Sequence, residues 1–215
     1  MVFHLITIFP ESLKSYFDSS ILKRAQKKKL IKINIINIRD FTKDKHKITD
    51  DRPYGGGAGM VMKIKPILNV IKTIRTSRTN RTKFIILSPA GKQFDQKMAR
   101  DWAKKYKNII LISGHYEGID ERVKKILKAQ EISVGPYVLT GGELPAGIII
   151  DSVSRHIPGV LGKKESLEEN RGIGIPVYTR PEVFEYRGKK YRVPKILLSG
   201  HHKKIEEWRK KHRKI

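Results

Sequence analysis

The chain has 215 residues, and its 46 Lys and Arg against 21 Asp and Glu give a formal net charge of +25 at pH 7. It contains no cysteine, which excludes disulfides, thiolate nucleophiles and cysteine-ligated zinc sites. So large a positive charge favours a polyanion such as nucleic acid as the partner, although a compositional bias towards lysine or an anionic membrane surface would also account for it. The first residues lack the basic segment and long apolar core of a signal peptide, so we expect a cytoplasmic protein.

Along the chain, apolar β-branched runs alternate with segments of helical spacing. Strands are predicted at residues 3–9, 31–38, 83–88, 108–113 and 131–135. Helices are predicted at residues 10–17, 65–75, 94–106 and 119–130. This alternation predicts an α/β fold with a parallel sheet and helices on both of its faces.

The character of the sequence changes after Gly159. Residues 1–158 form the predicted α/β domain, whereas residues 159–175 are polar, contain glycine and show no period, as in a mobile linker. Residues 176–215 are short and basic, and they predict a hairpin around Arg187-Gly188 and one helix near the end. We therefore expect a second, smaller domain.

Three predicted strands are followed by unusual glycine-containing loops. These are "ILSPAG" (86–91), "ISGHYEGIDER" (112–122) and "SVGPYVLTGGELPAG" (133–147). In a parallel sheet such strand ends gather ligands. None of the loops has the glycine spacing of a dinucleotide fold or a phosphate-binding loop. The loops are either tight turns or, as we expect from their joint occurrence, the walls of a backbone-rich, largely apolar pocket for a nucleoside with a small charged appendage.

A long loop at residues 40–62 combines charged residues with three consecutive glycines and a tyrosine. It fits RNA recognition, which favours stacking and shape, or else it is a disordered insertion. The histidines His115, His201 and His202 lack metal-ligand spacing, so we expect them to be surface or turn residues.

Five strings in this sequence carry a resemblance to a known family. They are "DDRPYGGGAGM", "GHYEGIDER", "GPYVLTGGELPA", "DSVSRHIPGVLG" and "YTRPE". Together they resemble the bacterial tRNA (guanine-N1)-methyltransferases of the SPOUT class, from the first strand to about Arg209. The resemblance implies a sheet that ends in a C-terminal trefoil knot, followed by a helical C-terminal domain that is short and truncated here. It also implies a homodimer with the active site at the subunit interface, S-adenosyl-L-methionine as methyl donor, a need for Mg²⁺, and a tRNA substrate with guanine at positions 36 and 37.

The resemblance also assigns roles to individual residues. For the methyl donor these are Leu87, Ser88, Pro89, Gly114, Tyr116, Glu117, Gly118, Val134, Gly135, Pro136, Tyr137, Val138, Leu139, Gly141, Gly142 and Pro145. For the tRNA they are Asp50, Arg52, Ser166 and Arg180. Pro136 stands where the family often has aspartate, and the loop between Asn170 and Tyr178 is shorter than usual and lacks a second acidic residue.

Methylation of guanine N1 requires removal of its proton and stabilisation of the charge that develops on O6. Arg155 matches the family's arginine for the second role, although an arginine at a helix end is often only a solvent or backbone contact. The family's base is an aspartate, and that position is Asn170 here. An amide cannot take the proton at neutral pH. Either the adjacent Glu169 acts as the base instead, or the chain binds tRNA with little or no catalysis. The carboxylates of Glu165, Glu168 and Glu169 would also be explained by a solvated loop without a catalytic role.

Overall fold

Five strands of the chain form one parallel sheet in the order β2-β1-β6-β5-β7. They are β1 (Val2–Thr7), β2 (Lys32–Asn37), β5 (Thr82–Gln93), β6 (Asn108–Ile112) and β7 (Gln130–Ser133). Every pairing between them is parallel. The predicted strands and the parallel sheet are therefore confirmed.

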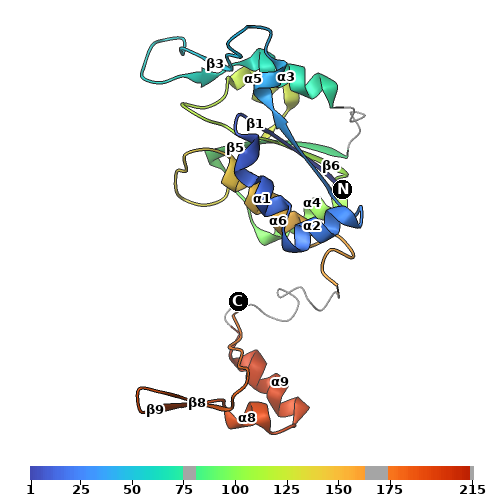
Figure 1. The fold of residues 1–215 in the computed structure, drawn as a ribbon, viewed down its shortest axis with the longest axis vertical. Helices are drawn as coiled ribbons and strands as arrows, with labels where there is room; N and C mark the ends of the chain where they lie inside the picture. The colour runs from blue at the N-terminus through green and yellow to red at the C-terminus, as the bar shows by residue number, and fades with distance from the viewer. Residues whose placement is uncertain (75–80, 163–173, 214–215) are drawn as a thin grey trace. The chain divides into compact units, whose positions relative to one another are not determined.

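The structure is a computed structural model that describes residues 1–74, 81–162 and 174–213. It separates into two units, Met1–Gly162 and Lys163–Ile215, and each is described by itself (Figure 1). Within the described residues, no helix combines the length and the apolar character needed to cross a membrane.

Helices cover both faces of the sheet in the first unit, as predicted. Figure 1 shows α1 (Lys14–Phe17), α2 (Ser20–Lys27), α4 (Gln96–Lys105) and α6 (Glu143–Ser154) on one face, with α3 (Ile64–Thr73) and α5 (Glu121–Leu127) on the other. In β6, Ile109 and Leu111 join the core on the first face, and Ile110 and Ile112 join the core on the second. The strand reads as one continuous apolar run because both of its faces are buried.

Two helices of the first unit were not among the predicted elements, and neither was the short α8 (Lys195–Leu198) of the second unit. The α2 segment is rich in Lys and Arg and buries only Leu22 and Ala25, so its apolar stripe is narrow. The α6 segment has the opposite property, because it buries most of its residues and shows no polar face that would reveal a helical period. The helix predicted from Pro10 is divided into a 3₁₀ turn, η1 (Pro10–Leu13), and the short α1.

The long loop at residues 40–62 is partly structured. It follows a 3₁₀ turn, η2 (Ile38–Phe41), and contains the antiparallel pair β3 (Asp50–Asp51) and β4 (Val61–Met62). Its glycines Gly55, Gly56 and Gly57 all have positive φ, a region that other residues rarely adopt. The side chain of Tyr54 beside them is fully exposed.

The second unit contains the predicted hairpin, β8 (Val183–Tyr186) with β9 (Lys189–Arg192), and the helices α8 (Lys195–Leu198) and α9 (His202–Lys211). Arg187 and Gly188 both have positive φ, as a two-residue turn of type I′ requires. The hairpin and the closing helix are thus confirmed. Of the predicted linker, Val160 packs against the core of the first unit, whereas residues 163–173 lie outside the described residues.

Candidate functional site

A cavity of about 380 Å³ lies at the carboxyl ends of β5, β6 and β7. The three glycine-containing loops that follow these strands form its walls. All of the residues assigned to the methyl donor by resemblance line it except Gly135 and Pro136. Residues from three separate loops, which the sequence analysis grouped into one pocket, therefore line a single cavity in the fold.

The glycines at this cavity allow the backbone of neighbouring loops to approach closely. A Cβ atom on Gly142 would lie 2.8 Å from both Cα and Oγ of Ser113, and the Gly142 N–H donates to the Gly114 carbonyl oxygen over 3.1 Å. A Cβ atom on Gly141 would lie 2.7 Å from His115 Nε2. Any larger residue would push the start of α6 away from the loop after β6.

The loop at residues 86–91, which forms the first wall of the cavity, differs from its prediction in where the strand ends. The strand was expected to end at Ser88-Pro89, but β5 continues to Gln93 after an irregularity, so that Leu87 and Lys92 are both paired with Ile132 of β7. The residues between Leu87 and Lys92 form a bulge without a partner in β7, and two of them, Ser88 and Pro89, line the cavity. A Cβ atom on Gly91 would lie 2.5 Å from the carbonyl carbon of Glu131, so β7 passes directly against this bulge.

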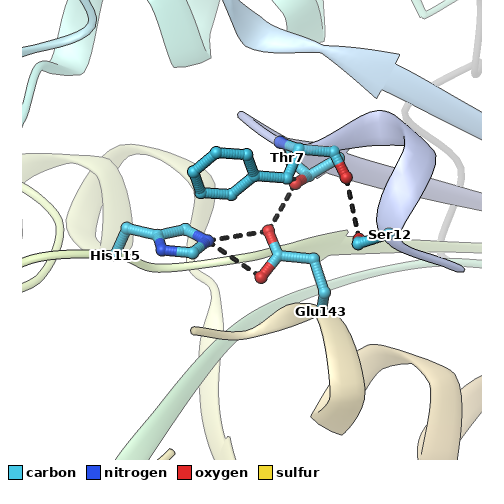
Figure 2. Close-up of polar contacts among 5 residues, drawn as sticks. Thr7, Ser12, His115 and Glu143 are labelled. Atoms are coloured by element: carbon cyan, nitrogen blue, oxygen red, sulfur yellow. Dashed lines mark hydrogen bonds and ion pairs between the residues drawn. The ribbon is translucent and has the colours of Figure 1, made fainter. Parts of the chain in front are cut away.

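A buried polar network beside the cavity was missed at the sequence level. Glu143, the first residue of α6, is 7% exposed, and its carboxylate accepts a hydrogen bond from the Thr7 hydroxyl at the end of β1 (Figure 2). His115 Nε2 lies 2.8 Å from both carboxylate oxygens. The only sequence signal was an acidic residue directly after Gly-Gly at the start of an apolar run.

The network corrects the expectation that His115 is a surface residue. Its side chain is only 11% exposed, it lines the cavity, and the ring of Phe9 packs edge-on against it with centroids 5.0 Å apart. The expectation was wrong because the carboxylate that binds this imidazole lies 28 residues further along the chain. His201 and His202 are exposed in the second unit, as expected.

Glu143 carries its charge at neutral pH. Burial by itself would raise the pKa of this carboxyl group, but the hydrogen bonds from Thr7 and His115 outweigh burial and hold the pKa below its ordinary value of 4.5. A fixed negative charge therefore lies immediately behind the cavity wall.

The cavity wall is acidic although the protein is strongly basic. Four of the lining residues are carboxylates, and one is a lysine: they are Glu117, Asp120, Glu121, Glu131 and Lys124. Lys124 lies 2.6 Å from Glu131 and 3.5 Å from Glu121, which partly neutralises that side. Such a wall suits a cationic or neutral ligand better than a phosphate.

The loop at residues 50–62 is anchored to this cavity. The Glu117 N–H donates to the Met60 carbonyl oxygen over 3.0 Å, the Met62 N–H donates to Gly118 over 2.9 Å, and the Asp120 N–H donates to Met62 over 3.1 Å. Because its end is held by backbone hydrogen bonds, this segment is not the disordered insertion that the sequence left open. It extends from the residues that line the cavity.

Among the other predicted residues of the first unit that the structure describes, Arg155, Asp50 and Arg52 do not line the cavity. Arg155 is the partly buried C-cap of α6, Asp50 and Arg52 lie in and after β3, and Arg180 is exposed in the second unit. Ser166, Glu169 and Asn170 lie outside the described residues. In the part of the chain that the structure covers, no group of three or more His, Asp or Glu side chains could hold a metal ion, so no ligand is assigned to Mg²⁺.

Comparison with known proteins gives a consistent result over the full length. A family model described as tRNA (Guanine-1)-methyltransferase TrmD matches residues 1–215. The tRNA (guanine-N(1)-)-methyltransferase of Clostridioides difficile is 52% identical over 215 residues, which cover 98% of this chain and 91% of that protein. Proteins of the same name from Carboxydothermus hydrogenoformans (52% identical; 98% and 82% covered) and Dictyoglomus turgidum (54%; 96% and 82%) are similarly close.

Proposed function

Because the chain belongs to the tRNA (guanine-1)-methyltransferase family, we propose that it transfers a methyl group from S-adenosyl-L-methionine to N1 of a guanine in tRNA. The substrate guanine is that at position 37, beside the anticodon, in tRNAs that also have guanine at position 36. The observation that carries this proposal is the cavity at the ends of β5, β6 and β7. It is lined by most of the residues that the resemblance assigns to the methyl donor, in a chain related to these enzymes over nearly its whole length. The relatives are named as enzymes, which gives no support to a tRNA-binding protein without catalysis.

The lining residues of the cavity and their charge suit the methyl donor. S-adenosyl-L-methionine supplies a methyl group on a cationic sulfonium, and it is a nucleoside with a small charged appendage. Leu87, Val138 and Leu139 offer apolar surface, and the glycine loops offer backbone groups at close range. The carboxylate of Glu117 and the nearby charge of Glu143 favour a cation there.

Two groups of the chain act on the guanine. Arg155 stabilises the negative charge that develops on O6, because a guanidinium remains cationic at all physiological pH values. Glu169 removes the N1 proton, because the amide at Asn170 cannot do so. Ser166 helps to position the base, and Asp50, Arg52 and Arg180 contact the tRNA.

The second unit supports tRNA as the substrate. Its hairpin carries exposed aromatic rings under cations, with the Arg187 guanidinium 5.3 Å from the Tyr186 ring and Lys189 Nζ 5.6 Å from the Tyr191 ring. Exposed rings and cations are the groups on which RNA bases stack and to which phosphates bind. We assign residues 1–158 to donor binding, residues 159–175 to the catalytic base and residues 176–215 to the tRNA.

We further propose that the fold includes the family's trefoil knot and that the enzyme is a Mg²⁺-dependent homodimer. The passage of β7 against the bulge at Gly91 supports threading of the chain at this point. The exposed apolar side chains Leu144 and Ile148 lie one turn apart on α6, and such a pair supports a subunit contact on this helix. Magnesium dependence rests on the family resemblance alone.

The function is tested with the purified chain, labelled S-adenosyl-L-methionine and Mg²⁺. We expect methyl transfer to a tRNA transcript with guanine at positions 36 and 37, and none to the same transcript with position 37 changed. Mapping of the product to N1 completes the assignment. Equal labelling of the two transcripts would refute the proposal.

The role of Glu169 is tested by single-turnover methyl transfer. We expect Glu169→Gln to lower the rate by about 10² to 10⁴, the usual effect of losing a positioned base. Glu168→Gln is the matched control, since it removes the same charge one residue away, and it should retain the rate of the native chain. If Glu169→Gln is fully active, another group takes the proton; Asn170→Asp then shows whether the family's position can still do so.

A further inference from the structure

We propose that His115 binds the methyl donor through its ring nitrogen Nδ1, and that Glu143 is the positioning residue that fixes this imidazole in the cavity wall. The proposal rests on the proposed function, because it assumes that S-adenosyl-L-methionine occupies the cavity. Neither residue was among those assigned to the donor by resemblance.

The first argument is the position of His115. It belongs to the loop after β6, between Gly114 and Tyr116, and all three residues line the cavity. Among the described residues, its hydrogen bonds run through Nε2 to the carboxylate of Glu143 (Figure 2). A carboxylate is only an acceptor, so Nε2 carries the hydrogen and Nδ1 is left for another partner.

The second argument is how firmly the ring is held. The two Glu143 oxygens lie 2.8 Å from Nε2, and the Phe9 ring packs edge-on with an interplanar angle of 73°. The Phe9 N–H in turn donates to the Thr7 hydroxyl over 2.9 Å. An imidazole restrained on two sides keeps one orientation, which is the property of a preorganised binding group.

The third argument is that Glu143 joins three separate parts of the site. Thr7 ends β1, His115 follows β6, and Glu143 itself begins α6 directly after Gly141 and Gly142. A buried carboxylate is a costly way to hold these elements together if stability alone is concerned, since apolar side chains of similar size often serve as well. A carboxylate at this position is accounted for if its role is to orient His115 and to place a negative charge at the cavity.

Two substitutions of His115 separate binding from packing. In His115→Gln the side-chain amide reaches the position of Nε2, so the contact with Glu143 is kept and the Nδ1 group is lost. In His115→Asn the amide takes the position of Nδ1, so the opposite contact is kept. Thr7→Val is the control for the network, because it removes the hydrogen bonds of the Thr7 hydroxyl with Glu143 and Phe9 but none of the direct contacts of the His115 ring.

The measurements are calorimetric binding of S-adenosyl-L-homocysteine to the purified full-length chain, steady-state kinetics and thermal melting. We expect His115→Gln to raise the Kd for this probe and the KM for the methyl donor about tenfold, the effect of one hydrogen bond. Its melting temperature, kcat and KM for tRNA should stay near those of the native chain. We expect His115→Asn to retain more of the affinity, and Thr7→Val to lower the melting temperature with less than about threefold change in Kd.

Unchanged probe binding by a folded His115→Gln protein overturns the proposal. Should that variant not fold, Glu143→Gln serves in its place, because it keeps the size of the side chain and removes the charge and one acceptor; unchanged Kd and KM for the donor again overturn the proposal. If the native chain itself does not bind the probe, the assignment of the cavity fails, and the proposed function fails with it. If the native chain binds S-adenosyl-L-homocysteine and His115→Gln binds it with the same Kd, the role of His115 is rejected and the proposed function is not.

Discussion

At Gly91, even one added methyl group would collide with the neighbouring strand. This glycine lies in the bulge of β5, where its missing side chain lets the backbone of Glu131 and Ile132 pass at close range. The neighbours are main-chain atoms of β7, and these cannot rotate out of the way as a side chain can. Glycine is needed at this position because there is no room for a side chain. Its backbone freedom is not needed, since the φ angle of Gly91 is not positive.

We therefore expect Gly91→Ala to destabilise the protein by about 1–3 kcal/mol, the usual cost of overpacking a core, measured by denaturant unfolding. Gly162→Ala is the matched control, since nothing lies within 4 Å of the added Cβ and its φ is not positive. This control should change the stability by less than about 0.5 kcal/mol. Equal effects of the two substitutions would contradict the close passage of β7.

At the scale of the element, α4 shows how a local signal fixes a helix start. The side chain of Asp95 accepts a hydrogen bond from the Met98 N–H over 2.6 Å, which satisfies a backbone donor that the first turn leaves unpaired. The helix that begins here buries Ala99 and Trp102 in the core. Its start was predicted within two residues from the apolar spacing alone, and the Asp95 cap agrees with that start.

We expect Asp95→Ala to lower the free energy of unfolding by about 1 kcal/mol through loss of this cap, and Asp95→Asn to have little effect. Asp101→Ala on the same helix removes an equal charge and only an exposed ion pair with Lys97. Such pairs contribute between about 0 and 1 kcal/mol, so this control should cost less than Asp95→Ala. Urea unfolding of the three variants distinguishes a capping effect from a charge effect.

The elements that sequence reasoning missed have physical causes. The strands were predicted because a strand buried on both faces is apolar at every position, and this pattern is local. α6 is buried on most sides and α2 on very few, so neither shows the one-sided period by which helices are recognised. The continuation of β5 past Ser88-Pro89 was also missed, because it depends on pairing with β7, some forty residues later.

At the scale of the whole molecule, the protein is basic and its cavity is acidic, so we expect binding of tRNA and binding of the methyl donor to depend differently on salt. A net charge of +25 favours a polyanion, whereas the cavity wall is acidic. We expect tRNA affinity to fall about 10³-fold or more between roughly 50 and 200 mM salt as counterions are released. Binding of S-adenosyl-L-homocysteine to the same preparation should change by less than about threefold. Parallel salt dependence of the two ligands would show that they do not use distinct surfaces.

Much of the site could be predicted from the sequence, and two of its features could not. The three glycine-containing loops were found because the carboxyl ends of parallel strands meet at one edge, a property of the topology alone. The contact between Thr7 and Glu143 joins residues 136 positions apart, and nothing in the spacing of a single sequence encodes it. The acidic character of the cavity was hidden as well, because the overall charge has the opposite sign.

The three backbone hydrogen bonds between the loop at residues 50–62 and Glu117 to Asp120 have a consequence for the order of events on the enzyme. A methyl donor that immobilises Gly114 to Gly118 also immobilises Met60 and Met62, which it does not touch. If this loop contacts the tRNA, as proposed for Asp50 and Arg52, the entropy cost of ordering it is met before the tRNA binds. By thermodynamic reciprocity, a tRNA that orders the same loop would then increase the affinity for the donor by an equal factor, and we expect the two substrates to bind cooperatively without sharing a contact.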